Sequence, residues 1–467
     1  MDAAAPWRNR GRVRVAIVGA GPTGLFLGTA LRRRGHAVTV VDRDGGPEPD
    51  GRWPRKGVMQ FHHAHAIRSQ VVDTLRRELP EAYELLLGVG AEPVEMPLPD
   101  GSTAVAGLRC QRSTYEQGVR AAAVTVPGVT LRTGHVDHVL ETVDSAGRHA
   151  AGIVVDGDTI EADLVVDASG RSGRVNRDRR APASAGGICG IAYVDRVYQL
   201  APGAEPGPMV NPIAWQANCD GYQCLVFLHE RGIFSALVIR STDDRDLVGL
   251  RHNAAFDAAV AAIPGLAQWT DPERSRPLTD VLPGGTLKNA YRSQRGPDGG
   301  LALPGLLFVG DSVCTTTPNF GRGLATTMLQ IDEVLRLLDT TVDVGGSVSN
   351  GRLTELGEAF DEWIEANMRP WVEDHAVMDE SLRRRWAGED LDLSGPRLPS
   401  DLVMEASRVD ERIGPAIGPY VAMQALPAVL DPVEPLARAV YETGWRAPLS
   451  PGPSRRELVE IVESAAA

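Results

Sequence analysis

The chain has 467 residues, which is long enough for two or three domains with a large buried interior. Its 48 Lys and Arg against 61 Asp and Glu give a net charge of −13 without a basic block, so a nucleic-acid partner is not expected. No apolar run approaches the roughly 18 residues of a membrane span, and no signal-peptide core precedes the first strand, so we expect a cytoplasmic protein. The five cysteines form no CxxC pair, which favours reduced thiols over disulfides or structural zinc.

The chain opens with an alternation of strand and helix. VRVAIV, 13–18, is a short apolar run that predicts a strand buried on both faces. GPTGLFLGTALRRRG follows with helical spacing and ends at Gly35, and HAVTVVD, 36–42, predicts the next parallel strand. This unit is typical of the start of a doubly wound sheet.

The middle of the chain predicts further helices and a second sheet. Helices are expected around Ile67–Glu78 and over 112–124, and alternating segments at 131–143 and 152–170 predict strands. Residues 186–245 are strand-rich, with CLVFL and FSALVI as the clearest pieces, and lack a glycine fingerprint. We interpret them as the sheet of a second domain.

A second glycine-rich loop, GDSVCTTTPNFGRG, occupies residues 310–323. It follows the apolar run GLLFV, which predicts a buried strand, and precedes LATTMLQIDEVLRLLD, which has helical periodicity. Beyond residue 350 the pattern is mostly helical.

The first glycine loop carries a dinucleotide-binding pattern. Gly19, Gly21 and Gly24 form GxGxxG between a strand and a helix, and Asp42 closes the second strand. The glycines permit the turn, the approach of a pyrophosphate and close helix packing, while Asp42 accepts hydrogen bonds from ribose hydroxyls. The carboxylate disfavours NADP at this site, and the pattern alone does not choose between NAD and FAD.

The second loop would suit the other end of a long flavin. Asp311 is placed to accept hydrogen bonds from ribitol hydroxyls, and the helix that begins near Gly323 would direct free N–H groups toward the C2 carbonyl of the flavin. The pair of loops therefore favours FAD.

Three segments resemble the flavin-dependent monooxygenases of the para-hydroxybenzoate hydroxylase superfamily: GAGPTG with Asp42, DLVVDASGRSG at 163–173, and the second loop. The central motif around Asp167 departs from the usual residues of the family. In the third motif, Cys314 and Leu324 replace the usual His and Asn. RKGVMQFHHAHAI, 55–67, and PWVEDHAVMDESLRRRW, 370–386, are similar to segments of bacterial flavin-dependent polyketide epoxidases.

The resemblance implies an α/β fold with a Rossmann-like FAD-binding domain of the glutathione-reductase type, an inserted β-sheet substrate domain and a helical C-terminal region. The expected boundaries are 12–185 and 296–350 for the two parts of the FAD-binding domain, 186–295 for the substrate domain and 351–467 for the C-terminal region. The residues expected to bind FAD are Gly19, Ala20, Gly21, Pro22, Thr23, Gly24, Asp42, Arg43, Arg55, Arg112, Val136, Asp167, Gly310, Asp311, Pro318, Gly321, Arg322, Gly323 and Leu324.

The implied activity is that of an FAD-dependent monooxygenase. Reduced FAD would form a flavin hydroperoxide that delivers one oxygen atom of O2, by epoxidation or hydroxylation, to a lipophilic intermediate of secondary metabolism such as antibiotic biosynthesis. NAD(P)H would be the reductant, either directly or through a separate flavin reductase. The helical tail would cover the pocket or mediate formation of a homodimer.

Few catalytic side chains are expected, since the cofactor carries the chemistry. His63 and His65 align with a family HAH segment, and we interpret them as packing beside the flavin or transferring protons rather than binding metal. Arg322 either points into solvent or adds positive charge near reduced flavin. Cys314 is interpreted as a packing residue, and Trp215 and Tyr222 as core or pocket wall of the substrate sheet.

Three other functions stay open on the same scaffold. A flavin-dependent halogenase is disfavoured because no two Trp residues have WxWxIP spacing, and Lys56 is the one candidate for a halogenase lysine. A flavin reductase or dehydrogenase is compatible with the motifs. A non-redox binding protein is disfavoured by retention of both glycine loops and Asp311.

Overall fold

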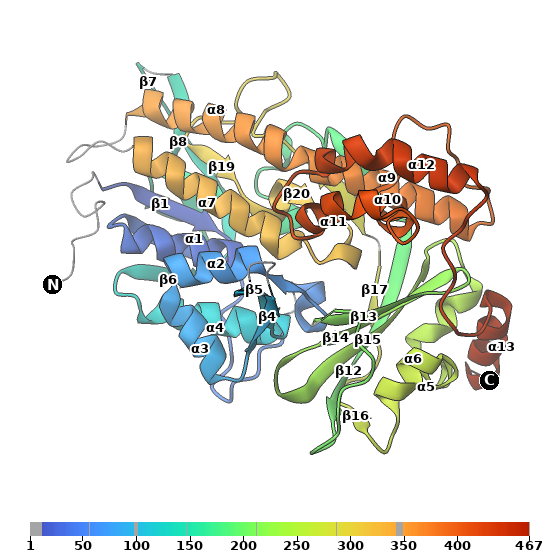
Figure 1. Cartoon of the computed structure of the whole chain (residues 1–467). Helices are drawn as coiled ribbons and strands as arrows, with labels where there is room; N and C mark the ends of the chain where they lie inside the picture. The colour runs from blue at the N-terminus through green and yellow to red at the C-terminus, as the bar shows by residue number, and fades with distance from the viewer. Residues whose placement is uncertain are drawn as a thin grey trace.

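The computed structural model of the protein describes residues 12–55, 57–97, 101–145, 147–211, 213–285, 287–341 and 349–466. A parallel sheet with its helices, a separate six-stranded sheet and a group of C-terminal helices are its main parts (Figure 1). No helix in the described ranges is long and apolar enough to cross a membrane.

The parallel sheet has five strands in the order β19-β10-β1-β2-β6. Their bounds are Leu306–Phe308, Leu164–Asp167, Arg14–Val18, Ala37–Asp42 and Val129–Thr133. The register pairs Val18 with Asp167 and with Val41, so the carboxyl ends of the central strands lie at one edge of the sheet. Because the glycine loops follow β1 and β19, this parallel arrangement brings two segments almost 300 residues apart in sequence to the same edge.

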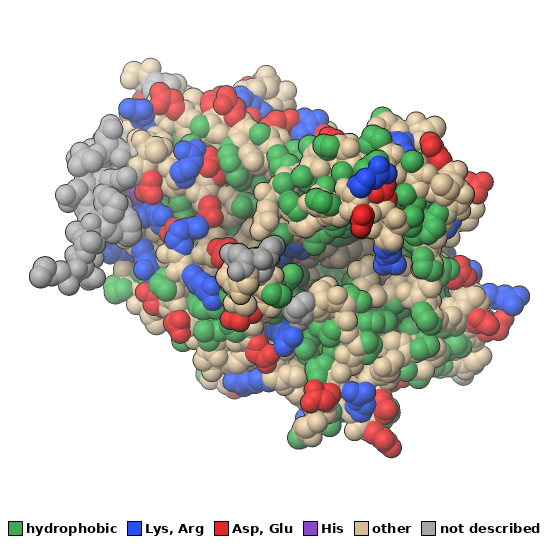
Figure 2. Space-filling model, viewed as in Figure 1, with side chains coloured by type: hydrophobic (Ala, Val, Ile, Leu, Met, Phe, Trp, Pro, Cys, Tyr) green, Lys and Arg blue, Asp and Glu red, His purple; other side chains and the backbone are tan. Residues whose placement is uncertain are grey.

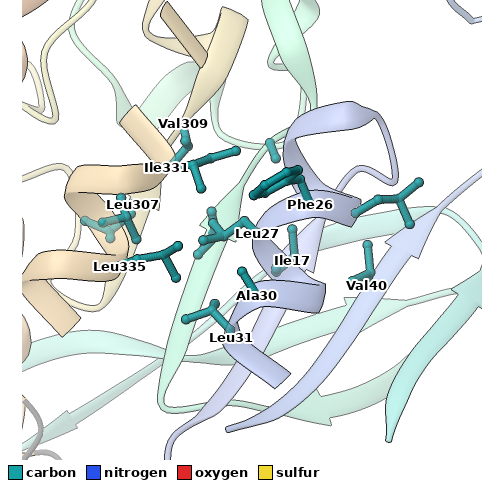
Figure 3. Close-up of a cluster of buried hydrophobic side chains, with 14 of the residues drawn as sticks. Ile17, Phe26, Leu27, Ala30, Leu31, Val40, Leu307, Val309, Ile331 and Leu335 are labelled. Carbon is teal, nitrogen blue, oxygen red and sulfur yellow. The ribbon is translucent and has the colours of Figure 1, made fainter. Parts of the chain in front are cut away.

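Helices α1 (Pro22–Arg33) and α7 (Gly323–Thr341) pack on this sheet through a shared apolar core. Figure 3 shows Phe26 and Leu27 of α1 beside Ile331 of α7, above Ile17 of β1. All four side chains are fully buried, as expected for apolar residues at helical spacing over a buried strand. The same domain contains α2 (Ser69–Glu78), α3 (Pro80–Gly88) and α4 (Arg112–Thr125).

Three small antiparallel sheets complete this part of the molecule. β7-β8-β9 comprises Val136–Asp144, Gly147–Val155 and Asp158–Glu161. β3-β5-β4 comprises Ile67–Arg68, Thr103–Arg109 and Glu92–Pro97. β11-β18-β20 comprises Ala185–Ile188, Lys288–Tyr291 and Cys314–Thr315.

The second large sheet is six-stranded, in the order β13-β14-β15-β12-β16 with β17 also paired to β12. The strands in that order are Ala214–Asn218, Tyr222–Leu228, Ile233–Ser241, Ile191–Leu200, Ser275–Pro277 and Leu282–Gly284. Helices α5 (Asn253–Ala262), α6 (Pro264–Thr270) and α13 (Arg455–Ala466) cover its outer face (Figure 1). The sequence did not lead us to expect α5 and α6 within this domain.

The C-terminal region is helical, as the pattern predicts. It comprises α8 (Asn350–Asn367), α9 (Arg369–Trp386), α10 (Ser400–Ala406), α11 (Gly414–Val421) and α12 (Glu434–Glu442). The last helix, α13, departs from this group, because Leu458 and Val462 are buried against the six-stranded sheet. The domain boundaries themselves stay predictions.

Candidate active site

A cavity of about 1070 Å³ extends from the carboxyl edge of the parallel sheet to the inner face of the six-stranded sheet. Residues of both glycine loops line it, together with apolar residues of β12, β14 and β15. Figure 2 shows a recess between the C-terminal helices and the six-stranded sheet, with hydrophobic side chains on both sides.

The first glycine loop is packed so tightly that two of its glycines admit no side chain. Gly19 has a φ of +106°, and a Cβ there would lie 2.6 Å from the carbonyl oxygen of Ala168. A Cβ on Gly24 would lie 1.9 Å from the carbonyl oxygen of Gly19. Gly21 differs, because it lines the cavity and the nearest atom to its Cβ would be an Arg55 nitrogen 3.7 Å away. The open side of Gly21 at the start of α1 fits a pyrophosphate close to the backbone.

Asp42 lines the cavity beside this loop. Its Oδ2 accepts a hydrogen bond from the Ala20 N–H at 2.7 Å, and its Oδ1 accepts one from the Asp44 N–H at 2.9 Å. Each carboxylate oxygen keeps a second lone pair for a ribose hydroxyl.

The second loop meets the first directly. A Cβ on Gly310 would lie 2.7 Å from Thr23 Oγ1, and the Gly310 N–H donates to Gln330 Oε1 at 2.8 Å. The Asp311 carboxylate lines the cavity and has no hydrogen bond to any described residue. Burial raises its pKa, whereas the charges of Arg112 and Arg171 lower it.

These features fit FAD. A free carboxylate at Asp311, an open Gly21 and the amino ends of α1 and α7 face one cavity, where hydroxyls, a pyrophosphate and a flavin carbonyl would find partners.

Arg55 and Arg112 are joined by a buried carboxylate beside the cavity. Glu116, which is fully buried, lies 2.7 Å from Arg55 Nε and accepts from Arg112 Nε at 2.6 Å. Arg55 Nη2 also donates to the Ala20 carbonyl at 3.2 Å, and its guanidinium lies 4.5 Å from the Trp53 ring centre. Both arginines are therefore fixed in place at the cavity wall.

His65 lines the cavity as a neutral ring. Arg112 Nη1 donates to its Nε2 at 3.1 Å, and its Nδ1 lies 3.0 Å from the His63 carbonyl, which requires the proton on Nδ1. Burial and the charge of Arg112 lower the pKa of His65 to about 3. Both ring nitrogens are occupied, so the structure supports the packing and hydrogen-bonding interpretation over proton transfer.

His63 lies behind the main cavity and lines a smaller one of about 130 Å³. Its Nδ1 is 3.4 Å from Asp195 Oδ2, and its ring meets Tyr193 edge to face. The described residues contain no group of three His, Cys, Asp or Glu that could hold a metal ion.

His229 also lines the smaller cavity. Its protonation tests whether burial keeps a histidine neutral in this region. Its Nε2 lies 3.1 Å from Ser235 Oγ, and burial lowers its pKa to about 4. A histidine held neutral by the fold stabilises the protein above its unfolded pKa, and this stabilisation is lost as the pH falls toward the folded value. Between pH 7 and 5 the unfolding free energy of the wild type should therefore fall by about 2 kcal/mol more than that of His229→Gln.

Urea denaturation of both proteins at the two pH values measures this difference. Equal pH dependence in the wild type and His229→Gln would show that His229 is not held neutral.

Most of the predicted FAD residues line the cavity. They are Gly19, Gly21, Pro22, Thr23, Asp42, Arg43, Arg55, Arg112, Val136, Asp311, Pro318, Gly321, Arg322, Gly323 and Leu324. Ala20, Gly24, Asp167 and Gly310 do not, and they support the loops from behind. Asp167 accepts from Ser169 N at 3.0 Å and from Asn176 Nδ2 at 2.8 Å, so its carboxylate shapes the loop after β10.

Trp215 and Tyr222 lie on the face of the six-stranded sheet opposite the cavity. Trp215 packs against Gly265 of α6, and the Tyr222 hydroxyl donates to the Pro453 carbonyl at 2.9 Å. The structure therefore corrects their interpretation as pocket wall and supports core packing. The cavity wall consists instead of alternate residues of this sheet: Tyr193, Leu225, Phe227, Leu237 and Ile239.

Sequence reasoning missed this wall although its signal was present. Side chains alternate across a strand, and within CLVFL the residues Leu225 and Phe227 share the face opposite Cys224. Which of the two faces of the sheet lines the cavity depends on which face is covered by α5, α6 and α13.

The structure shows how deeply Arg322 and Cys314 of the second loop are buried. Arg322 is 1% exposed, so its side chain does not point into solvent. Cys314 is 1% exposed, and burial raises its pKa to about 12, which agrees with a packing role. Lys56, the candidate halogenase lysine, lies outside the described residues.

Comparison with known proteins gives a match to one family and partial matches to two curated proteins. Residues 12–187 match the family described as FAD binding domain. Squalene epoxidase erg1 of Schizosaccharomyces pombe is 28% identical over 143 residues, which is 30% of this chain and 30% of that protein. Thiamine thiazole synthase of Methanococcus aeolicus is 27% identical over 173 residues, 36% of this chain and 59% of that protein. The matches thus span less than two thirds of the length of both relatives.

Solved structures share the fold at low identity. The flavin-dependent brominase Bmp2 covers 86% of this chain and 100% of its own, with a TM-score of 0.57 and 15% identity. pqsL of Pseudomonas aeruginosa, a probable FAD-dependent monooxygenase, covers 81% of this chain and 99% of its own, with a TM-score of 0.55 and 14% identity. The predicted fold class is confirmed: the structures share the fold, and residues 12–187 match the FAD binding domain.

Proposed function

We propose that this chain is an FAD-dependent monooxygenase that inserts one oxygen atom from O2 into a lipophilic natural-product intermediate, by epoxidation or hydroxylation. The observation that carries the proposal is the continuity of the cavity, which joins both glycine loops to the apolar face of the six-stranded sheet. A cofactor held by the loops would therefore present its reactive end to a substrate lying on that face.

Bound FAD would supply the activation of O2. Gly21 and the amino end of α1 would hold the pyrophosphate, Asp42 the ribose hydroxyls and Asp311 the ribitol hydroxyls. The amino end of α7 would stabilise negative charge on the reduced ring. His65 stays neutral and orients Arg112 rather than moving a proton.

The substrate would contact Tyr193, Leu225, Phe227, Leu237 and Ile239. These side chains favour an apolar molecule and exclude water from the reacting end of the cavity. The similarity of 143 residues of this chain to squalene epoxidase, whose name describes oxidation of a lipid, supports a lipophilic substrate.

Phe227 gives a direct test of the substrate wall. Phe227→Ala removes apolar contact area from the cavity, so we expect the KM for an accepted lipophilic substrate to rise about tenfold without loss of FAD. Tyr222→Phe on the same strand is the matched control, because its side chain faces away from the cavity, and it should leave KM unchanged. Steady-state kinetics compares the two variants, and equal KM values would place the substrate elsewhere.

Flavin-dependent halogenation is the second candidate, since the brominase Bmp2 shares the fold. Labelled dioxygen separates the two reactions. Mass spectrometry of the product from candidate polyketides or terpenoids should show one labelled oxygen atom. A product without label would indicate halogenation, dehydrogenation or reduction. NAD(P)H as reductant, a separate reductase, a homodimer and a cytoplasmic location remain predictions.

A further inference from the structure

Arg322 belongs to the second glycine loop and lies at the cavity lining, and its guanidinium packs among residues of the C-terminal helices α9 and α11. It is 1% exposed. Its guanidinium carbon lies 4.4 Å from the ring centres of Trp371 and Tyr420 and 5.1 Å from that of Phe320. Three aromatic rings thus surround a buried cation, an arrangement that stabilises the charge where water is excluded.

One nitrogen of the guanidinium, Nη1, also donates hydrogen bonds within the cage. Arg322 Nη1 donates to His375 Nε2 at 2.9 Å and to the Tyr420 hydroxyl at 3.2 Å. An arginine only donates, so His375 accepts through Nε2 and is neutral; burial and the charge of Arg322 lower its pKa.

A buried carboxylate faces the same charge. Asp374 Oδ2 lies 3.7 Å from Arg322 Nη1 and accepts from the Tyr420 hydroxyl at 2.6 Å. Ser400 donates to the other oxygen of Asp374. Residues of α9 and α11 therefore converge on this one side chain of the loop, and Ser400 of α10 supports them through Asp374.

The opposite side of the loop is held by the segment before α2. Arg68 Nη1 donates to the Phe320 carbonyl at 2.8 Å, and a Cβ on Gly321 would lie 2.6 Å from the Ala66 Cβ. Arg68 also donates to the carbonyl of Val421, at the end of α11. The loop is therefore fixed between residues 66–68 and the C-terminal helices.

The C-terminal helices do not themselves line the cavity. Among the described residues, none that follows Thr327 of α7 in the sequence lines the cavity. The C-terminal region therefore reaches the site from behind, through Arg322, rather than as a cover over the pocket.

We propose that Arg322 is a positioning residue through which the C-terminal helices set the conformation of residues 317–323 and the direction of the amino end of α7. This inference rests on the proposed function, because that helix end would face the flavin ring. A displaced helix end would bind FAD less tightly and would stabilise negative charge on the reduced ring less, which lowers the reduction potential.

Four full-length variants test the inference. Arg322→Gln removes the charge, Arg322→Lys keeps the charge without the planar fork, and Tyr420→Phe removes the hydroxyl shared by Arg322 and Asp374. Arg369→Gln is the matched control, since Arg369 lies on the surface of α9 and pairs with Glu365 and Glu373.

Three measurements are compared: amide hydrogen exchange of residues 319–326 in the FAD-free protein, FAD affinity, and the FAD midpoint potential. Arg322→Gln should exchange faster, bind FAD about tenfold more weakly and have a lower potential. Tyr420→Phe should change exchange, affinity and potential in the same direction by a smaller amount. The three values of Arg322→Lys should lie between those of Arg322→Gln and the wild type. Those of Arg369→Gln should match the wild type.

Wild-type exchange, affinity and potential in Arg322→Gln would overturn the proposal. If that variant does not fold, Tyr420→Phe decides by the same criteria. If the wild-type protein binds no FAD, the proposed function fails, while exchange in the FAD-free protein still shows whether Arg322 positions the loop.

Discussion

Gly21→Ala is expected to weaken FAD binding about a hundredfold while leaving the FAD-free fold intact. A Cβ on Gly21 has its nearest protein atom 3.7 Å away, and its φ of −74° suits any residue. The methyl group would instead enter the cavity where the pyrophosphate approaches the backbone. The cost to the FAD-free protein should be about 1 kcal/mol or less, as for alanine replacing glycine at a helix N-cap.

Gly24→Ala should behave in the opposite way. Its Cβ would lie 1.9 Å from the Gly19 carbonyl oxygen, a backbone atom that cannot move aside, so the unfolding free energy should fall by about 3 kcal/mol or more.

Fluorescence titration with FAD and thermal unfolding of the FAD-free proteins separate the two effects. Gly187→Ala is the matched control, because Gly187 also has open space and does not line the cavity. Unchanged FAD affinity in Gly21→Ala would contradict a pyrophosphate site at the first loop.

Asp311→Ala should lower FAD affinity by about ten- to a hundredfold, because it removes charged acceptors for the ribitol hydroxyls. The carboxylate has no hydrogen bond to a described residue, so its removal leaves no protein partner unsatisfied. The FAD-free variant should therefore be about as stable as the wild type.

The raised pKa of Asp311 adds a pH signature. If the ionised carboxylate binds FAD, wild-type affinity falls as the pH drops through that raised value, and Asp311→Asn lacks this step. Asp73→Ala, at an exposed position of α2, is the control and should retain wild-type affinity. Equal affinities and equal pH profiles in the wild type and the Asp311 variants would place the ribitol elsewhere.

Local sequence patterns were enough for the parallel sheet and both loops. Glycine spacing after an apolar strand predicts where a backbone must turn and approach a ligand, and Gly19, Gly21 and Gly24 lie in that geometry. Parallel pairing of β1 and β10, and of β10 and β19, then follows from the doubly wound pattern.

Contacts between distant segments were beyond the reach of local patterns. The cage around Arg322 requires His375 and Tyr420, which lie 53 and 98 positions away, and no residue spacing near the loop predicts these contacts. The facing of Trp215 depends on α6 packing against its sheet. Alternation within a strand divides its side chains into two sets, but it does not show which set faces the ligand.

We propose above all that both glycine loops hold the same FAD across one cavity. The visible absorbance spectrum of the purified protein, with the FAD released on denaturation measured per chain, tests it most directly. We predict the bands of oxidised flavin and one FAD per chain, either as purified or after reconstitution. A colourless protein that takes up no FAD on reconstitution would contradict the account.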